Sequence, residues 1–184
     1  MTAEQLLIAL IRIAGSLPVL RWPFYGALLA ILIDLSDLFW MEVLDLGGLR
    51  GYQSFDKRLD LVYMATFLAV ALRWRGRERA IAVALFVFRM LGVAAFEVTG
   101  QRTLLLAFPN VFEFWYVLIA ARDQFAPKPL LPQAPWPART AMLWLIPLTL
   151  AKLAQEYLLH FGRWLDRYSF FEFWAVLWRA LTPW

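Results

Sequence analysis

The sequence predicts an all-α protein, a bundle of about six transmembrane helices followed by a C-terminal interfacial helix. Three observations predict this class. Of the 184 residues, 62% are hydrophobic and 17% are charged, against about half and about a quarter in soluble domains. Ten Trp and fifteen Phe are typical of membrane proteins, whose aromatic side chains gather at the lipid–water interface. Long apolar runs recur along the chain, so we expect residues 1–184 to form a single integral membrane domain, in a prokaryotic plasma membrane.

Each expected span is an apolar run of roughly 20 residues, because an α-helix rises about 1.5 Å per residue and the hydrocarbon core is about 30 Å thick. Residues 3–20 form the first and weakest run, since Arg12 interrupts it and Pro18 lies near its end. They either span or lie tilted in the interface. Pro109 lies early in one later run, where we expect a helix to tolerate it. The five stronger runs are Phe24–Leu44, Leu59–Trp74, Ala80–Val98, Thr103–Ala121 and Ala138–Leu159.

Two segments differ from these runs. Residues 122–138 contain five prolines, which forbid a continuous helix and indicate a stiff connector at the surface. Residues 164–184 are rich in aromatic side chains, and their polar residues fall on one side of a helical projection. We expect an amphipathic helix in the membrane interface there, with a last short span as the alternative.

Composition excludes several classes of function. The absence of Cys excludes disulfides and thiolate metal sites, and a single His, His160, excludes a His-rich metal site. The net charge of +4 does not indicate a nucleic-acid partner, because the basic residues are scattered at the ends of apolar runs. The segment RWRGRER at residues 73–79 carries four Arg. Positive loops tend to face the cytoplasm, which would place the loop between Asp37 and Asp56 outside, although the total bias is small.

Ionisable side chains inside apolar runs are costly and often mark a site. Asp34 and Asp37 are three residues apart, about 60° around a helix, and Asp56 and Asp60 are four apart, about 40°. If the chain returns antiparallel, the two pairs face each other and need a counter-charge. A divalent cation, Mg²⁺ or Mn²⁺, is one solution, because both prefer carboxylate oxygens. Ion pairs with basic neighbours are the other, and the candidates are Arg50, Lys57 and Arg58.

This stretch resembles the CDP-alcohol phosphatidyltransferases, polytopic enzymes of phospholipid synthesis. Their signature is D-x2-D-G-x2-A-R, then eight or nine residues, then G-x3-D-x3-D. Asp34, Asp37, Asp56 and Asp60 occupy its four Asp positions. The start, QLLIALIRIAGSLPVL, is similar to the family's first segment. The resemblance implies two divalent ions, Mg²⁺ or Mn²⁺, held by the four Asp against the diphosphate of a CDP-lipid. It also implies that Asp60 is the catalytic general base for the acceptor alcohol.

The same stretch departs from the signature at the positions expected to receive the nucleotide. Leu38 and Tyr52 stand where the family has Gly, and Met41 and Glu42 stand where it has Ala-Arg. Gly allows a ligand to approach the backbone closely, and Arg can hold phosphate. Two hypotheses follow. One is a metal-dependent CDP-alcohol phosphotransferase, active or degenerate. The other is a non-catalytic helical subunit of a larger membrane protein complex, with membrane lipids and other membrane subunits as partners and no nucleic acid.

Other polar residues in the runs are expected to stabilise the bundle. Lys152 and Glu156 are four residues apart, as in a helix-stabilising pair, and we expect them to face the bundle interior. Arg89 and Glu97 lie about 80° apart on one helix, so each is expected to pair with another helix. Glu113 and Asn110 are expected to form a polar packing pair.

Overall fold

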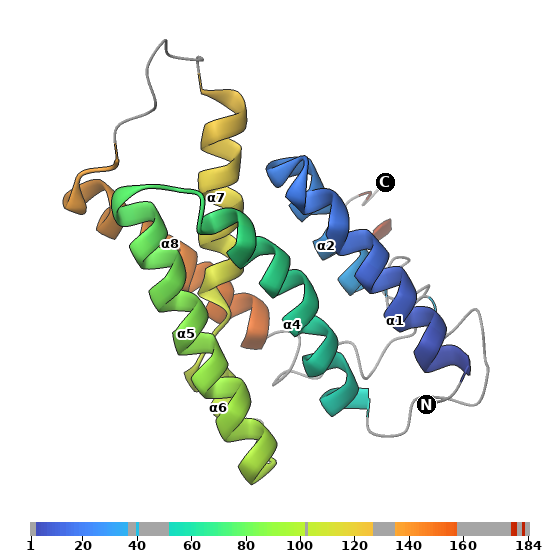
Figure 1. Cartoon of the computed structure of the whole chain (residues 1–184). Helices are drawn as coiled ribbons and strands as arrows, with labels where there is room; N and C mark the ends of the chain where they lie inside the picture. The colour runs from blue at the N-terminus through green and yellow to red at the C-terminus, as the bar shows by residue number, and fades with distance from the viewer. Residues whose placement is uncertain are drawn as a thin grey trace.

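The computed structural model describes residues 3–36, 40, 52–101, 103–126, 135–157, 178–179 and 182. Within them the protein is all-helical, which confirms the predicted class, and no strand occurs in this part of the chain (Figure 1). The elements are α1 (Ala3–Ser16), the 3₁₀ helix η1 (Leu17–Leu20), α2 (Pro23–Leu35), α4 (Tyr52–Ala71), α5 (Gly76–Thr99), α6 (Thr103–Ala107), α7 (Val111–Phe125) and α8 (Ala138–Glu156).

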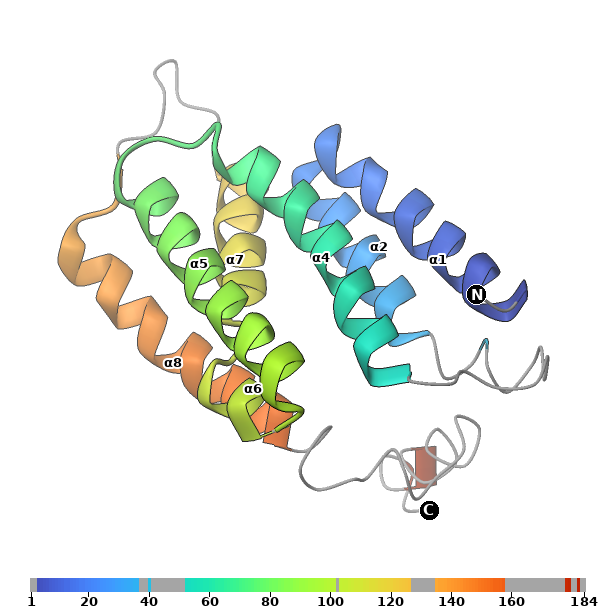
Figure 2. The same cartoon turned by 60° about the horizontal axis from the view of Figure 1, so that its bottom comes forward.

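Helix α7 forms the centre of the bundle and contacts α2, α4, α5 and α8. Its side chains Phe112, Trp115 and Tyr116 are fully buried. The Tyr116 ring stacks on Phe67 of α4, with 4.2 Å between the ring centroids. Helix α1 lies at the other side of α4, next to α2 (Figure 2). A large aromatic core at α7 therefore holds the helices in a fixed arrangement.

Among the described residues, one helix is both long and apolar enough to cross a membrane. This is α5, whose 24 residues contain a stretch of mean hydropathy 2.1. It confirms a helix at Ala80–Val98. Residues 5–20 and α2 are apolar but shorter. The six spans expected from the sequence are therefore not established by length and composition.

The run Thr103–Ala121 was expected to be one helix, and that prediction is wrong. The chain forms α6 and α7 with a break at residues 108–110. Pro109 has no N–H to continue the helix, and its ring disfavours helical backbone at Phe108. Arg89 Nη1 donates to the carbonyl oxygens of Leu105 and Phe108 at 3.3 and 2.8 Å, which supplies a donor for the Leu105 carbonyl that Pro109, four residues later, lacks.

For two other predictions, the structure describes only part of the residues concerned. In the run Phe24–Leu44, α2 ends at Leu35, and Ser36 Oγ donates to the carbonyl of Ile33 at 2.7 Å. Residues 37–39 and 41–44 lie outside the described residues. The same holds for residues 127–134 of the proline-rich connector and for most of the C-terminal segment 164–184.

Candidate functional site

The first part of the site is an arginine on the buried face of α1. Ile8, Arg12 and Ser16 are spaced by four residues and are all buried, so they form one stripe along the helix. Ile8 packs in a small cluster with Leu59 of α4. The spacing that buries Ile8 and Ser16 also carries Arg12 into the bundle.

Asp34 belongs to a helix face of small residues. Gly26, Ala27 and Ala30 are the buried residues of α2, and Asp34 follows Ala30 by four positions on that side. A Cβ at Gly26 would overlap the backbone of Val19 in η1, so only Gly allows the two segments to approach so closely. This close packing brings α2 beside α1 and places Asp34 next to Arg12.

Asp60 lies on the main buried stripe of α4. Tyr63, Met64 and Phe67 follow it at spacings of three, four and seven, and all are buried. An apolar residue is expected at such a position, and the stripe instead begins with a carboxylate. Asp60 therefore points between α4 and α1 rather than toward solvent.

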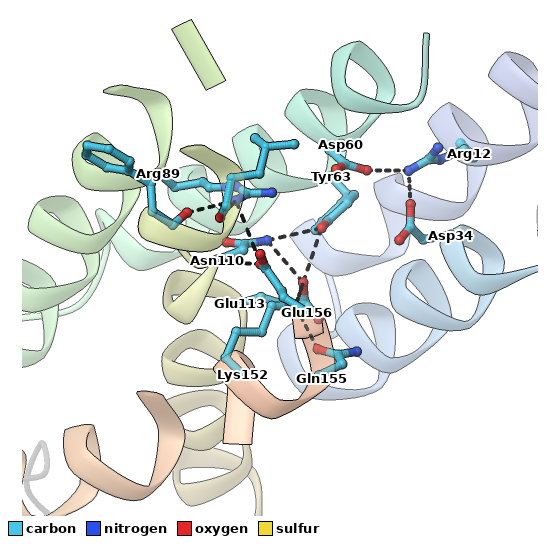
Figure 3. A network of polar contacts seen from close by, with 12 residues as sticks. Arg12, Asp34, Asp60, Tyr63, Arg89, Asn110, Glu113, Lys152, Gln155 and Glu156 are labelled. Atoms are coloured by element: carbon cyan, nitrogen blue, oxygen red, sulfur yellow. Dashed lines mark hydrogen bonds and ion pairs between the residues drawn. The ribbon is translucent and has the colours of Figure 1, made fainter. Parts of the chain in front are cut away.

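Arg12 joins the two acids, and we call these three residues the arginine node. Its Nη2 donates to Asp60 Oδ1 at 2.7 Å and also forms an ion pair with Asp34 Oδ1 (Figure 3). The side chains of Arg12, Asp60 and Asp34 are 4%, 10% and 25% exposed. Among the described side chains of the node, one cation is shared by two acids in a poorly solvated place.

Of the two acid pairs expected to face each other, the structure brings Asp34 and Asp60 together at Arg12. Asp37 lies outside the described residues, and the Asp56 backbone is in α4 while its side chain is not described. Arg58 had been expected as a counter-charge for these acids, but its described ion pair joins it to Glu97 of α5 at 3.8 Å.

Sequence reasoning missed Arg12 as the partner of the acids. A signal was present, because a single Arg interrupts the apolar run at residues 3–20, and such a residue usually faces a bundle interior and a partner. The counter-charges considered from the sequence, Arg50, Lys57 and Arg58, all lie close to the acids along the chain. Arg12 instead precedes Asp60 by 48 residues.

The Arg12 guanidinium lies between Asp34 and Asp60. Oδ1 of each acid faces it, so a metal ion placed between these two oxygens would lie against a positive charge. Within the described residues, no three acidic or imidazole side chains come together as a metal-binding group. Metal binding by this pair requires Arg12 to move away.

A second group of buried charges lies between α5, α7 and α8. We call it the ionic cluster, and its charged members are Arg89, Glu113, Lys152 and Glu156. Lys152 Nζ lies 3.2 Å from Glu113 Oε2, and Arg89 Nη1 lies 3.7 Å from Glu156 Oε1 (Figure 3). Lys152 and Glu156 face the interior as expected, but each pairs with another helix rather than with the other. The pairings of Arg89 and Glu97 with other helices are confirmed.

Hydrogen bonds complete the ionic cluster. Tyr63 Oη and Asn110 Nδ2 donate to Glu113 Oε2 at 3.2 and 3.1 Å, which confirms the expected pairing of Glu113 with Asn110. The Asn110 N–H donates to Glu156 Oε1 at 2.9 Å. Two cations balance two anions, so this cluster is electrically neutral and well supplied with donors.

A third buried acid, Glu78, lies at the other end of α5, before the apolar stretch Ala80–Val98. Its Oε1 accepts from Arg122 Nη1 at 2.7 Å and from the Trp136 N–H at 2.8 Å, which ties α5 to α7 and to the start of α8. Burial alone would raise the pKa of Glu78, but these hydrogen bonds and the Arg122 charge outweigh it and lower the pKa below its ordinary value of 4.5.

Comparison with protein-family models, with curated proteins and with solved structures finds no match to this chain. Within the described residues, the structure shows an all-helical protein with the arginine node, the ionic cluster and the separate buried pair of Glu78 and Arg122.

Proposed function

We propose that this protein is a membrane-embedded helix bundle resembling the CDP-alcohol phosphatidyltransferases, in which the acid site no longer supports catalysis. It acts as a non-catalytic subunit of a larger membrane protein complex. In this proposal the helices of the described bundle cross the membrane about six times.

Exposed apolar side chains support the membrane part of the proposal. On α8, Met142, Leu143, Ile146 and Leu150 are each about 60% exposed, and α1 and α2 carry further exposed Leu. Contiguous apolar surface of this kind marks contact with lipid or with another protein. Helix α5 is long enough to cross, since 24 residues rise about 36 Å.

The observation that carries the non-catalytic role is the ion pair of Arg12 with both Asp34 and Asp60. An arginine shared by the two acids supplies a counter-charge and so weakens the electrostatic need for a divalent cation. The sequence changes agree with this, because Leu38, Tyr52 and Glu42 replace the glycines and the arginine of the family signature. The counter-charge of the site is thus part of the protein itself.

A second candidate function is the active CDP-alcohol phosphotransferase. Its support is the convergence of Asp34 and Asp60, which come from different helices and occupy two of the four Asp positions of the signature. Under this candidate Asp60 would receive the proton of the acceptor alcohol. Arg12 would first have to leave the acids.

An assay of CMP release distinguishes the two candidates. The purified protein would be incubated with a CDP-lipid, Mg²⁺ or Mn²⁺ and a set of alcohols, next to Asp60→Asn. We expect no release above the Asp60→Asn background. Release that disappears in Asp60→Asn would establish the transferase and overturn the non-catalytic role.

The subunit role has its own test. Extraction of the full-length protein from its native membrane in mild detergent should yield a complex with other membrane polypeptides in fixed ratio. A monodisperse species that contains this chain alone would contradict that role.

A further inference from the structure

One end of the bundle carries exposed arginines from several elements. We call it the arginine face. The residue that follows η1, the turn between α4 and α5 with the first turn of α5, and the start of α8 all contribute to it. Its members are Arg21, Arg73, Arg75, Arg77, Arg79 and Arg139, and all six are exposed.

Two contacts show that these segments gather at the same end. Arg73 Nη1 donates to the Leu20 carbonyl at 3.4 Å, which joins the end of α4 to the end of η1. Arg77 Nη1 donates to the Trp136 carbonyl at 3.3 Å, which joins the start of α5 to the segment before α8. In Figure 1 the α4–α5 turn and the C-terminal end of α7 lie on this side of the bundle.

The positive charge of this face is not neutralised by the acids beside it. Glu78 and Asp123 are the acids at this end among the described residues, and both pair with Arg122. None of the six arginines forms an ion pair with an acid in the described part of the chain. The described charges at this end, seven arginines and two acids, sum to a formal +5.

Exposed apolar and aromatic side chains adjoin the arginines. Trp22 and Phe125 are 58% and 64% exposed, and Tyr25 lies beside Phe125, with 6.4 Å between the ring centroids. A nucleic acid would pair with the arginines but leave these apolar side chains in water. A phospholipid surface satisfies both, because phosphates lie next to hydrocarbon at the membrane interface.

We infer that the arginine face binds the anionic head groups of membrane phospholipids, with Trp22 at head-group level. This inference rests on the membrane embedding proposed above. Guanidinium groups bind phosphate oxygens in a two-pronged geometry. Since arginine-rich ends favour the cytoplasmic side, this face lies on the cytoplasmic leaflet. About 16 Å of α2 separates Pro23 from Asp34, so the arginine node lies near or beyond the middle of the bilayer.

Lipid titration tests the binding. The full chain in mild detergent would be titrated with phosphatidylglycerol or phosphatidylcholine, and the rise in melting temperature would give an apparent affinity. We expect a preference for phosphatidylglycerol that falls about 25-fold in Arg75→Gln/Arg79→Gln, since each arginine near an anionic surface contributes about fivefold. The matched control is Arg58→Gln, an exposed arginine from the opposite end of α4, which should keep the preference.

The possible failures are distinguishable. Equal stabilisation by the two lipids, or a double variant that prefers phosphatidylglycerol as strongly as the wild type, would overturn the inference while the membrane proposal stands. Full-length protein recovered in the soluble fraction after cell lysis would overturn the membrane proposal itself.

Labelling of single cysteines tests the orientation, because the chain contains no native Cys. Gln124 lies beside the arginine face and Gln101 follows the far end of α5, and both are exposed. An impermeant maleimide should label Gln124→Cys in inverted membrane vesicles and Gln101→Cys in intact cells. The reverse pattern, or labelling of both from one side, would overturn the assignment to the cytoplasmic leaflet.

Discussion

The arginine node and the ionic cluster are both buried groups of charges, but they differ in balance. The cluster pairs two cations with two acids, and Tyr63 and Asn110 supply further hydrogen bonds. In the part of the chain that the structure describes, the node sets one cation against two acids. The cluster thus has a cation for each acid, whereas the two acids of the node share Arg12, in a place where a buried charge is costly.

This difference indicates different roles for the two groups. The cluster joins α7 and α5 to α8, so its role is to stabilise the packing of these helices. The node has the acids expected of a cation site, and their counter-charge comes from Arg12. We infer that the acid pair is the remaining part of such a site, held in place by an arginine.

The largest expected effect comes from unbalancing the cluster. Lys152→Met leaves Glu113 buried without its cation, and breaking a buried pair in this way should lower the free energy of unfolding by about 3–5 kcal/mol. Chemical denaturation in detergent measures the loss. The double variant Lys152→Met/Glu113→Gln should recover part of it, and equal losses in the single and double variants would show that the charge pair is not the cause.

Arg12→Gln should have a smaller but substantial effect on the node. It leaves Asp34 and Asp60 without their cation, but Asp34 is a quarter exposed to solvent, so we expect a loss of about 2–3 kcal/mol. Millimolar Mg²⁺ should restore part of the loss in Arg12→Gln and leave the melting temperature of the wild type unchanged. A wild type stabilised as strongly as the variant would show that the acids lack a sufficient counter-charge.

The lowered pKa of Glu78 predicts a modest dependence of stability on pH. Its pKa is lowered in the folded protein, so its contribution is complete above pH 4.5 and is lost as the pH falls below 4.5 through the folded pKa. Melting temperatures between pH 6 and pH 3 measure this loss. Glu78→Gln should remove this component of the acid dependence, and an unchanged pH profile would contradict the assigned role of Glu78.

The smallest effect is expected at the exposed pair of Arg58 and Glu97. The Arg58 side chain is 73% exposed and its nearest described carboxylate oxygen is 3.8 Å away. Arg58→Gln should change the free energy of unfolding by less than about 0.5 kcal/mol. A loss comparable with that of Lys152→Met would mean that burial does not determine how much an ion pair contributes to the stability of this protein.

The sequence was sufficient to predict the helical class, the helix at Ala80–Val98 and the meeting of Asp34 with Asp60. These rest on local quantities, namely hydropathy along the chain and the helical period. The break at Pro109 was not predicted, because it depends on a tertiary contact, the hydrogen bonds that Arg89 donates to the freed carbonyls. Hydropathy does not contain that information.

Of the basic residues proposed as counter-charges for the acids, Arg58 pairs elsewhere, and Arg50 and the Lys57 side chain lie outside the described residues. Arg12 was not among the candidates. Arg58 is close to Asp60 in sequence but belongs to the exposed side of α4, whereas Arg12 reaches Asp60 through the packing of α1 against α4. Which helix packs beside an acid is set by long-range contacts such as the close approach at Gly26. The partners of Lys152 and Glu156 were misassigned in the same way.

Binding of Mn²⁺ to the purified protein tests the central claim most directly. Titration followed by electron paramagnetic resonance would be carried out on the wild type, Arg12→Gln and Arg12→Gln/Asp60→Asn. If Arg12 is the counter-charge of the acid pair, the wild type shows no saturable site, Arg12→Gln gains one, and the double variant loses it. Saturable binding by the wild type that is lost in Asp60→Asn would contradict the account and return the acid site to metal-dependent chemistry.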